Sequence, residues 1–326
     1  MQALDIALRA QELTGRQTSM SDRSTRTLPV AVFVHVHYPD VWDWMAPWIA
    51  QTLQRPFHLV LTTSGDIAQL RLPETPLLVS HQIITTDNRG RDIRPFLSAL
   101  ASTADYTIGL KLHTKKSTHR LDGSDWGRML VHALLPAPET VDRLISAMER
   151  DPRLALVGAD GMLVSMAPWM QRNARPMRRA ARRLGLPYGE MLRKTPVFAA
   201  TSMFWFQRAA LAPLLHVGLD DLFEPETGQV DGTAAHALER LFSPIAEAGG
   251  GVVTTMKGVC LSQPEMARAQ LLTISRGLAD QPNDYLVPLG KYARFLLRVP
   301  GLRRTYQSMP DVIRRRVRRL RLRDKH

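Results

Sequence analysis

The chain has 326 residues and a net charge of +13; 44% of its residues are hydrophobic and 22% are charged. This composition is that of a folded protein that can bury a sizeable core, in one large or two ordinary domains. The single cysteine, Cys260, excludes an internal disulfide and metal clusters built of cysteine alone, and no apolar run reaches the ~18 residues that a membrane span requires.

The positive charge is concentrated in two segments. Residues 271–326 carry a net charge of +10 and residues 172–194 a net charge of +7, so the rest of the chain has a net charge of −4. Basic segments of this kind usually contact an anionic partner: nucleic acid, a membrane surface or phosphate groups. The N-terminus lacks the basic-then-apolar pattern of an export signal, so we expect a cytoplasmic protein.

Apolar segments alternate with segments of helical periodicity along the first third of the chain. In the first expected helix, for example, Val41, Trp44 and Trp48 fall at helical spacing. The expected strands are 30–36, 57–62, 76–80 (with Ile83 and Ile84 beyond it) and 106–112, and the expected helices are 41–53 and 93–101.

The same alternation continues to residue 255. Strands are expected at 154–158, 197–206 and 252–255, and a long helix at 232–248. Strands that are almost continuously apolar indicate an α/β fold, a mostly parallel sheet with helices on both faces. We therefore predict one α/β domain at 29–270 with a basic insert at 167–195, a poorly ordered segment at 1–28, and a basic helical C-terminal extension at 271–326.

Polar and charged side chains follow the first four expected strands. In open parallel sheets, ligands bind outside the carboxyl ends of the strands, so these side chains are expected to meet at one edge. Their histidine, hydroxyl, amide and basic groups suit a nucleotide and its phosphates. The candidates are His35 and Tyr38 at the end of the first strand, Thr63 after the second, Asn88, Gly90, Arg91 and Asp92 after the third, and His113, Lys115, Lys116 and Ser117 after the fourth.

Each of these groups also has a purely structural interpretation. His35 is equally consistent with a hydrogen-bonded core histidine, and the segment around Gly90 with a turn followed by Asp92 as a helix N-cap. The cluster at residues 113–117 is consistent with a solvated loop. The chain contains no GxxxxGK[ST] and no GxGxxG pattern, which argues against P-loop and dinucleotide-binding proteins.

A second cluster of charged residues precedes the long helix expected at 232–248. Asp231 is expected to cap this helix, which places His236 and Arg240 four residues apart on one helical face. One interpretation makes Asp231 or Glu226 a general base at the start of the helix. The other is a capping box with solvent-exposed salt bridges, and the spacing alone leaves both open.

Five segments occur in this order between residues 30 and 242: VFVHVHYPDVW; DNRGRDIRPFL; KLHTKKSTH, followed by Trp126 and Arg128; SMFWFQRAALAPL; and DGTAAHALERLF. The series resembles the rhamnan synthesis protein F family, bacterial glycosyltransferases of polyrhamnose and related surface polysaccharides. The chain departs from the family pattern at Ala200, where a glycine is expected.

The resemblance implies an enzyme, a hexosyl- or rhamnosyltransferase. Its donor would be a nucleotide sugar, with dTDP- or GDP-rhamnose as first candidates, and its acceptor a lipid-linked glycan in cell-surface polysaccharide synthesis. The resemblance also implies the A-type glycosyltransferase fold, a single nucleotide-binding α/β domain.

Basic residues follow the fourth strand, where metal-dependent enzymes of that fold carry an Asp-x-Asp pair. Cationic side chains can neutralise the charge that develops on a departing diphosphate without a metal. We therefore predict transfer without a cofactor, with a divalent cation left open as the alternative. His113, Lys115 and Lys116 are expected on the phosphates with Ser117 adding a hydrogen bond, and Asn88, Gly90, Arg91 and Asp92 are expected to shape the pocket, with His35, Tyr38 and Thr63 at its base.

A carboxylate is expected to deprotonate the acceptor hydroxyl, with Asp231 as first candidate and Glu226 as second. Supporting roles are expected for Lys111, Trp126, Arg128, His236, Glu239 and Arg240.

The basic C-terminal tail fits an anionic membrane surface, since each basic residue near such a surface contributes ~1 kcal/mol. We therefore expect a peripheral protein at the inner face of the cytoplasmic membrane; the alternative is a solvated, disordered tail. Two other classes compete with an enzyme. A nucleic-acid-binding protein is disfavoured because the body of the chain is acidic and lacks a helix-turn-helix pattern. A non-catalytic partner in polysaccharide assembly is the second.

Overall fold

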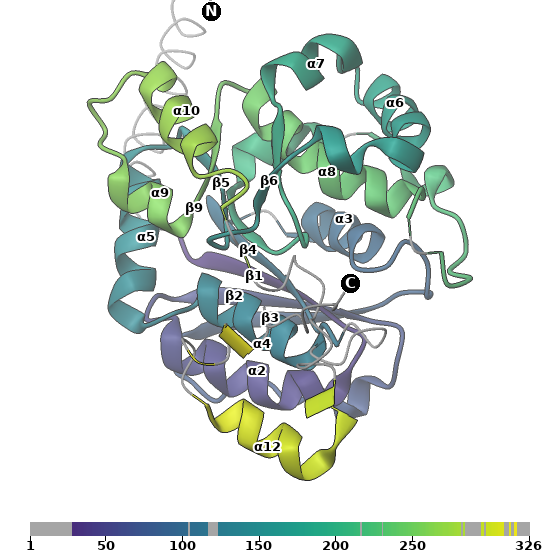
Figure 1. Ribbon diagram of the computed structural model, residues 1–326, viewed down its shortest axis with the longest axis vertical. Coiled ribbons are helices and arrows are strands. Elements are labelled where there is room, and N and C mark those ends of the chain that lie inside the picture. Colours follow the sequence, from purple (N-terminus) through teal and green to yellow (C-terminus); the bar gives the residue numbers. More distant parts are fainter. Residues whose placement is uncertain are drawn as a thin grey trace, which may run out of the picture.

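A central β-sheet carries the fold (Figure 1). The computed structural model describes residues 28–103, 105–116, 123–215, 217–229, 231–281, 283, 295–296, 298–309, 313 and 316–317. Within these residues, seven strands form the sheet in the order β3-β2-β1-β4-β8-β5-β9. Apart from Leu28, the N-terminal segment predicted at 1–28 lies outside the described residues.

The first four strands pair in parallel, as the sequence predicts. They are β1 (Val30–Val36), β2 (Phe57–Thr63), β3 (Leu78–Thr85) and β4 (Ile108–His113). Their register places His35 at the end of β1 beside Thr62 of β2 and His113 of β4. The predicted convergence of polar side chains at one edge of the sheet is therefore confirmed for these three strands.

The third strand differs from the prediction of 76–80. It begins at Leu78 and runs without interruption through Ile83 and Ile84 to Thr85. Because β3 lies at the edge of the sheet, most of its side chains are exposed, and polar residues such as His81 and Gln82 do not interrupt it. A search for a buried apolar run therefore detects only part of this strand.

Helices cover both faces of the sheet (Figure 1). One face packs against α2 (Pro39–Thr52), α4 (Gly123–Leu134), α5 (Pro138–Arg150) and α9 (Met256–Leu261). The other packs against α3 (Ile93–Ser102), α6 (Ala174–Arg183), α7 (Tyr188–Lys194) and α8 (Ala234–Ala248). The prediction of an α/β fold of the A-type glycosyltransferase kind, mostly parallel with helices on both faces, is confirmed.

The single strand predicted at 197–206 is wrong: this segment forms two strands in different sheets. β7 (Val197–Ala199) pairs with β6 (Leu163–Ser165), whereas β8 (Phe204–Gln207) lies between β4 and β5 (Leu154–Gly158), antiparallel to both. Between them, Thr201 and Ser202 have φ angles of 82° and 53°. These left-handed conformations end the extended segment of β7 and direct the chain into the central sheet, where β8 begins.

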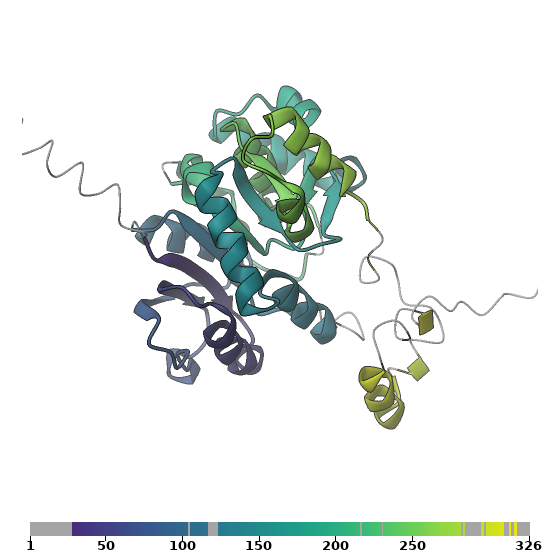
Figure 2. The same ribbon diagram turned by 90° about the vertical axis from the view of Figure 1, so that its left-hand side faces the viewer.

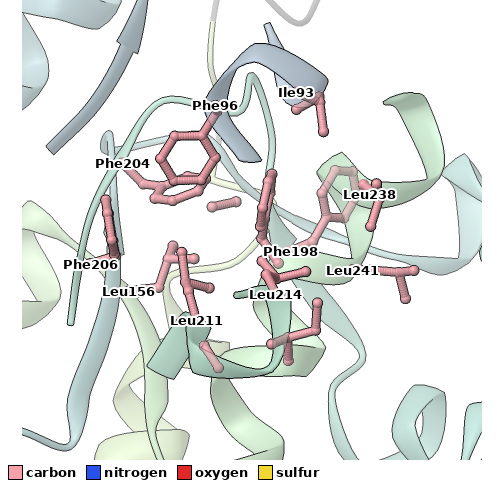
Figure 3. Packing of buried hydrophobic residues seen from close by; sticks show 14 of the residues in the cluster. Ile93, Phe96, Leu156, Phe198, Phe204, Phe206, Leu211, Leu214, Leu238 and Leu241 are labelled. Carbon is pink, nitrogen blue, oxygen red and sulfur yellow. The ribbon is translucent and has the colours of Figure 1, made fainter. Parts of the chain in front are cut away.

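Strand β8 anchors the hydrophobic cores on both faces of the sheet. Phe204 and Phe206 pack against Phe96 of α3, and the Phe96 and Phe206 rings meet edge to face with centroids 5.7 Å apart (Figure 3). Trp205 points to the opposite face, as expected from the alternation of side chains along a strand, and its Nε1 donates a 2.9 Å hydrogen bond to the Leu134 carbonyl. The end of β4, and with it His113, is thereby held between packed layers.

The α/β domain extends beyond residue 270, the C-terminal boundary predicted for it. Helix α10 (Arg268–Gly277) packs on the edge strand β9 (Val252–Thr255) through buried Leu271 and a hydrogen bond from Ser275 Oγ to the Val253 carbonyl. The boundary expected at residue 271 thus passes through a helix. Helix α12 (Pro300–Ser308) lies apart from the sheet (Figure 2), and no helix of the described residues has the length and apolarity of a membrane span.

Candidate functional site

A pocket with about 340 Å³ of empty space, which includes open solvent, lies at the carboxyl end of β4. Segments far apart in the sequence form it: the loop before α3, the end of β4, the turn before β8 and the first turns of α8. The lining residues are Arg91, Asp92, Ile93, His113, Lys115, Thr201, Ser202, Ala235, His236 and Glu239.

A buried ion pair lies beneath this pocket. Lys111, which is 1% exposed, donates hydrogen bonds from Nζ to Asp92 Oδ2 at 2.5 Å and to the Ser202 carbonyl at 2.8 Å. Ser202 Oγ donates to the same Asp92 oxygen at 2.6 Å. Burial opposes ionisation of Asp92, but the positive charge around it and these hydrogen bonds hold its pKa well below the ordinary range. Lys111 is thus paired with Asp92.

Two histidines of the predicted donor site, His113 and His35, are buried beside this ion pair. Burial lowers the pKa of His113 to about 3, although Asp92 acts in the opposite direction. Burial likewise lowers the pKa of His35 to about 4, and His35 Nδ1 lies 3.0 Å from Thr62 Oγ1 in a hydrogen bond. Both imidazoles are therefore neutral at neutral pH, so neither contributes a positive charge to the site.

The loop before α3 takes a left-handed conformation at two consecutive residues, Gly90 (φ 69°) and Arg91 (φ 54°). Gly90 is required here because a Cβ would lie 2.6 Å from Phe223 Cδ1. Arg91 donates a hydrogen bond to the Gln229 carbonyl, and its Nε lies 3.5 Å from Glu226 Oε2. Asn88 is exposed and does not line the pocket. Of this predicted group, Arg91 and Asp92 reach the pocket.

The two lysines after β4 point to different partners. Lys115 lines the pocket, and its Nζ lies 4.7 Å from the centroid of the Trp126 ring on α4. Lys116 forms a 2.6 Å ion pair with Asp40 in the first turn of α2, and its Nζ lies 5.0 Å from the Tyr38 ring centroid. Ser117 lies outside the described residues.

Two further predicted residues have contacts away from the pocket. The guanidinium of Arg128, on α4, lies 4.9 Å from the Trp44 ring centroid. Thr63 is buried, and its hydroxyl donates to the Val36 carbonyl at 2.8 Å and accepts from the Gly65 amide at 3.0 Å. Both arrangements hold elements of the fold together.

Helix α8 begins two residues later than an N-cap at Asp231 would require. Thr233 is the N-cap and accepts a hydrogen bond from the His236 amide, so the predicted cap at Asp231 is wrong. Gly232, with a φ angle of 84°, separates Asp231 from the helix. Asp231 Oδ1 instead accepts a 2.7 Å hydrogen bond from Asn173 of the basic insert.

Glu239 is the carboxylate of α8 that lines the pocket. Its Oε1 accepts a 2.7 Å hydrogen bond from the Thr201 amide, and its side chain is 23% exposed. Arg240, on the same helix, contacts both Glu239 Oε2 and Asp231 Oδ1 at 3.5 Å and donates to the His236 carbonyl. Neither Asp231 nor Glu226 lines the pocket, whereas His236 and Glu239 do.

The candidate residues from the sequence do not include Thr114, Thr201 and Ser202. Thr114 Oγ1 accepts hydrogen bonds from the His37 and Tyr38 amides at 2.9 Å, which ties the end of β1 to β4. Thr201 and Ser202 line the pocket from the turn before β8. The one signal for this turn was the departure from the family pattern at the neighbouring Ala200.

No group of three or more His, Cys, Asp or Glu side chains could hold a metal ion within the part of the chain that the structure describes. Transfer without a metal stays a prediction.

Removing one partner of the Lys111–Asp92 pair is expected to leave an uncompensated buried charge. Lys111→Met and Asp92→Asn should each lower the free energy of unfolding by about 3–5 kcal/mol. The double variant should lose clearly less than the sum, because the two residues act on each other directly. Urea unfolding of the wild type and the three variants measures this coupling.

The exposed pair Lys116–Asp40 is the matched control for this cycle. Its side chains are 30% and 64% exposed, so Lys116→Met and Asp40→Asn should each change the unfolding free energy by less than about 1 kcal/mol. If substitutions in the two pairs changed the free energy of unfolding equally, the buried pair would not be the stronger contact.

Comparison with known proteins places the chain in a family. Over 233 residues, 69% of its length, it is 35% identical to the uncharacterized protein WxcX of Xanthomonas campestris pv. campestris strain B100 and, to the same extent, of strain ATCC 33913. The match covers 32% of each relative, so the chain spans about a third of their length. Residues 4–250 match the family described as Rhamnan synthesis protein F. The chain therefore belongs to the rhamnan synthesis protein F family, as its sequence motifs predict.

Proposed function

We propose that the chain is a glycosyltransferase domain that transfers a sugar from a nucleotide-sugar donor to a lipid-linked glycan, with rhamnose as the first candidate. The main support is the convergence of Arg91, Lys115 and the start of α8 on one pocket, at the carboxyl end of a strand in an A-type fold. Ligands of open α/β sheets bind at this edge. The family name, which refers to rhamnan synthesis, is consistent with the same activity.

The positive charge that supports diphosphate binding comes from few groups. Lys111 is neutralised by Asp92, and burial keeps His113 neutral. Arg91 and Lys115 are the cationic side chains of the pocket lining. The first turn of α8 adds the positive end of its helix dipole, because Ala235 and His236 also line the pocket. Lys116 is a weaker candidate than expected from the sequence, since it does not line the pocket and pairs with Asp40.

Glu239 replaces Asp231 as our first candidate for the base. In the proposed step, Glu239 takes the proton of the acceptor hydroxyl while the acceptor oxygen forms a bond to the anomeric carbon. The bond between that carbon and the diphosphate oxygen breaks, and the nucleoside diphosphate leaves with the electron pair. Glu239 is favoured because it lines the pocket, whereas the carboxylates of Asp231 and Glu226 do not.

The basic C-terminal extension is proposed to bind the anionic inner face of the cytoplasmic membrane, where the proposed lipid-linked acceptor would be located. Residues 310–326 contain eight Lys and Arg residues. Helix α6 adds exposed arginines, among them Arg175, Arg178 and Arg179.

Donor binding tests the proposed function. Titration calorimetry with dTDP-rhamnose, GDP-rhamnose and other nucleotide sugars, in EDTA and in Mn²⁺, should show one donor that binds without a metal. Lys115→Met should weaken its binding at least about tenfold, since hydrogen bonds to charged groups contribute ~1.5–3 kcal/mol. Arg143→Gln, an exposed change on α5, is the control and should bind normally. Absence of binding to every nucleotide sugar would refute the proposal, and binding only in Mn²⁺ would refute its metal-independent part.

The base assignment is tested by two amide substitutions. Glu239→Gln should lower transfer to membrane-extracted glycolipid ~10²–10⁴-fold, because general base catalysis contributes a factor of this size. Donor affinity should stay near that of the wild type, since the glutamine oxygen can still accept the hydrogen bond from the Thr201 amide. The matched variant is Asp231→Asn; if it abolishes transfer and Glu239→Gln does not, Asp231 is the base.

Vesicle binding tests the membrane contact. The full chain should co-sediment with vesicles of phosphatidylglycerol and phosphatidylethanolamine, and less so at high salt, where charges are screened. Vesicles of phosphatidylcholine alone are the control. A chain ending at residue 309 that binds the anionic vesicles equally well would remove this role from residues 310–326.

A further inference from the structure

The turn before β8 holds a threonine in an unfavourable backbone conformation. Thr201 has a φ angle of 82°, and Ser202 follows with 53°. A left-handed conformation is costly for a β-branched residue and is maintained only where the surroundings impose it. Such residues concentrate at binding and catalytic sites, and this turn lines the pocket.

Three side chains impose this conformation. Glu239 Oε1 accepts the Thr201 amide at 2.7 Å, Asp92 Oδ2 accepts Ser202 Oγ at 2.6 Å, and Lys111 Nζ donates to the Ser202 carbonyl at 2.8 Å. The contacts satisfy the amide of Thr201, the carbonyl of Ser202 and the hydroxyl of Ser202. They leave the hydroxyl of Thr201 without a role in holding the turn.

Two buried polar atoms of the pocket residues have no hydrogen-bond partner within the described structure: Thr201 Oγ1 and His113 Nδ1. The two residues are 7% and 8% exposed. His113 Nδ1 lies 3.4 Å from Asp92 Oδ2 but makes no aligned hydrogen bond. An unpaired buried polar atom costs free energy, and each such case in a folded protein calls for an explanation.

Hydroxyl groups of a ligand would provide partners for both atoms. A hydroxyl donates one hydrogen bond and accepts others, so it can pair with a threonine hydroxyl and with either nitrogen of a neutral imidazole. A phosphate oxygen is the poorer match, because burial lowers the pKa of His113 to about 3 and the imidazole carries no positive charge. Arg91 and Lys115 supply the positive charge elsewhere in the same pocket.

We propose that Thr201 Oγ1 and His113 Nδ1 form a subsite that binds hydroxyl groups of the transferred sugar. This inference rests on the proposed function, because it assumes a nucleotide-sugar donor with its diphosphate near Lys115. It changes the role predicted for His113 from a phosphate ligand to a ligand of the sugar. It also makes Thr201 a residue that discriminates between donors by their sugar.

Isosteric substitution of Thr201 tests the subsite. Thr201→Val keeps the shape and the β-branch but removes the hydroxyl, whereas Thr201→Ser keeps a hydroxyl. Calorimetric titration with dTDP and with dTDP-rhamnose separates the nucleotide from the sugar. Thr201→Val should bind dTDP like the wild type and lose about 3- to 10-fold in affinity for dTDP-rhamnose, and Thr201→Ser should retain most of that affinity.

Thr254→Val is the matched control. Thr254 Oγ1 is also buried without a partner among the described residues, but it lies on β9 and does not line the pocket. This variant should bind both ligands like the wild type. His113→Phe keeps an aromatic ring and gives an independent test if Thr201→Val does not fold; it should show the same selective loss for the sugar nucleotide.

The outcomes separate the two proposals. If the wild type binds neither dTDP nor any nucleotide sugar, the proposed function fails. If the wild type prefers dTDP-rhamnose to dTDP and both substitutions leave that preference intact, the subsite fails and the proposed function stands. If Thr201→Val weakens dTDP as much as dTDP-rhamnose, the hydroxyl belongs to the nucleoside and the sugar assignment is refuted.

Discussion

The buried ion pair between Lys111 and Asp92 is the contact on which the candidate site depends. Lys111 lies in a strand that is buried along its whole length, where an unpaired ammonium is too costly to retain. Asp92 and the Ser202 carbonyl satisfy it. Because Asp92 belongs to the loop before α3 and Ser202 to the turn before β8, one lysine fixes the positions of three segments that line the pocket.

The convergence of these segments at one edge of the sheet could be predicted from the sequence, but the state of their charges could not. Apolar runs predict parallel strands, and parallel strands bring residues such as His113 and Asp92 together. The cluster after β4 looks uniformly cationic in the sequence. In the fold, an acid 19 residues earlier neutralises Lys111, burial keeps His113 neutral, and Asp40 pairs with Lys116. The partners and the burial of a side chain depend on the tertiary structure, so the spacing of residues in the sequence does not predict them.

The choice of a catalytic carboxylate shows the same limit. Asp231 precedes a long helical pattern, so the sequence predicts that it caps the helix. The left-handed Gly232 and the cap at Thr233 shift the start of the helix, and Asn173 from the basic insert binds the carboxylate. The position of that insert depends on packing against α8 and has no local signal. Glu239 reaches the pocket instead, three residues after His236 on the same face of α8.

The strained turn links the stability of the fold to recognition at the pocket. Glu239, Asp92 and Lys111 stabilise the left-handed conformations of Thr201 and Ser202, and the first two also line the pocket. Protein contacts therefore hold this turn in place before a ligand binds. Because binding does not have to order the turn, the entropic cost of association is lower. Removing a whole side chain therefore does not show whether that residue binds the ligand or stabilises the turn. Only substitutions that keep the backbone contacts while removing one polar atom can distinguish the two roles.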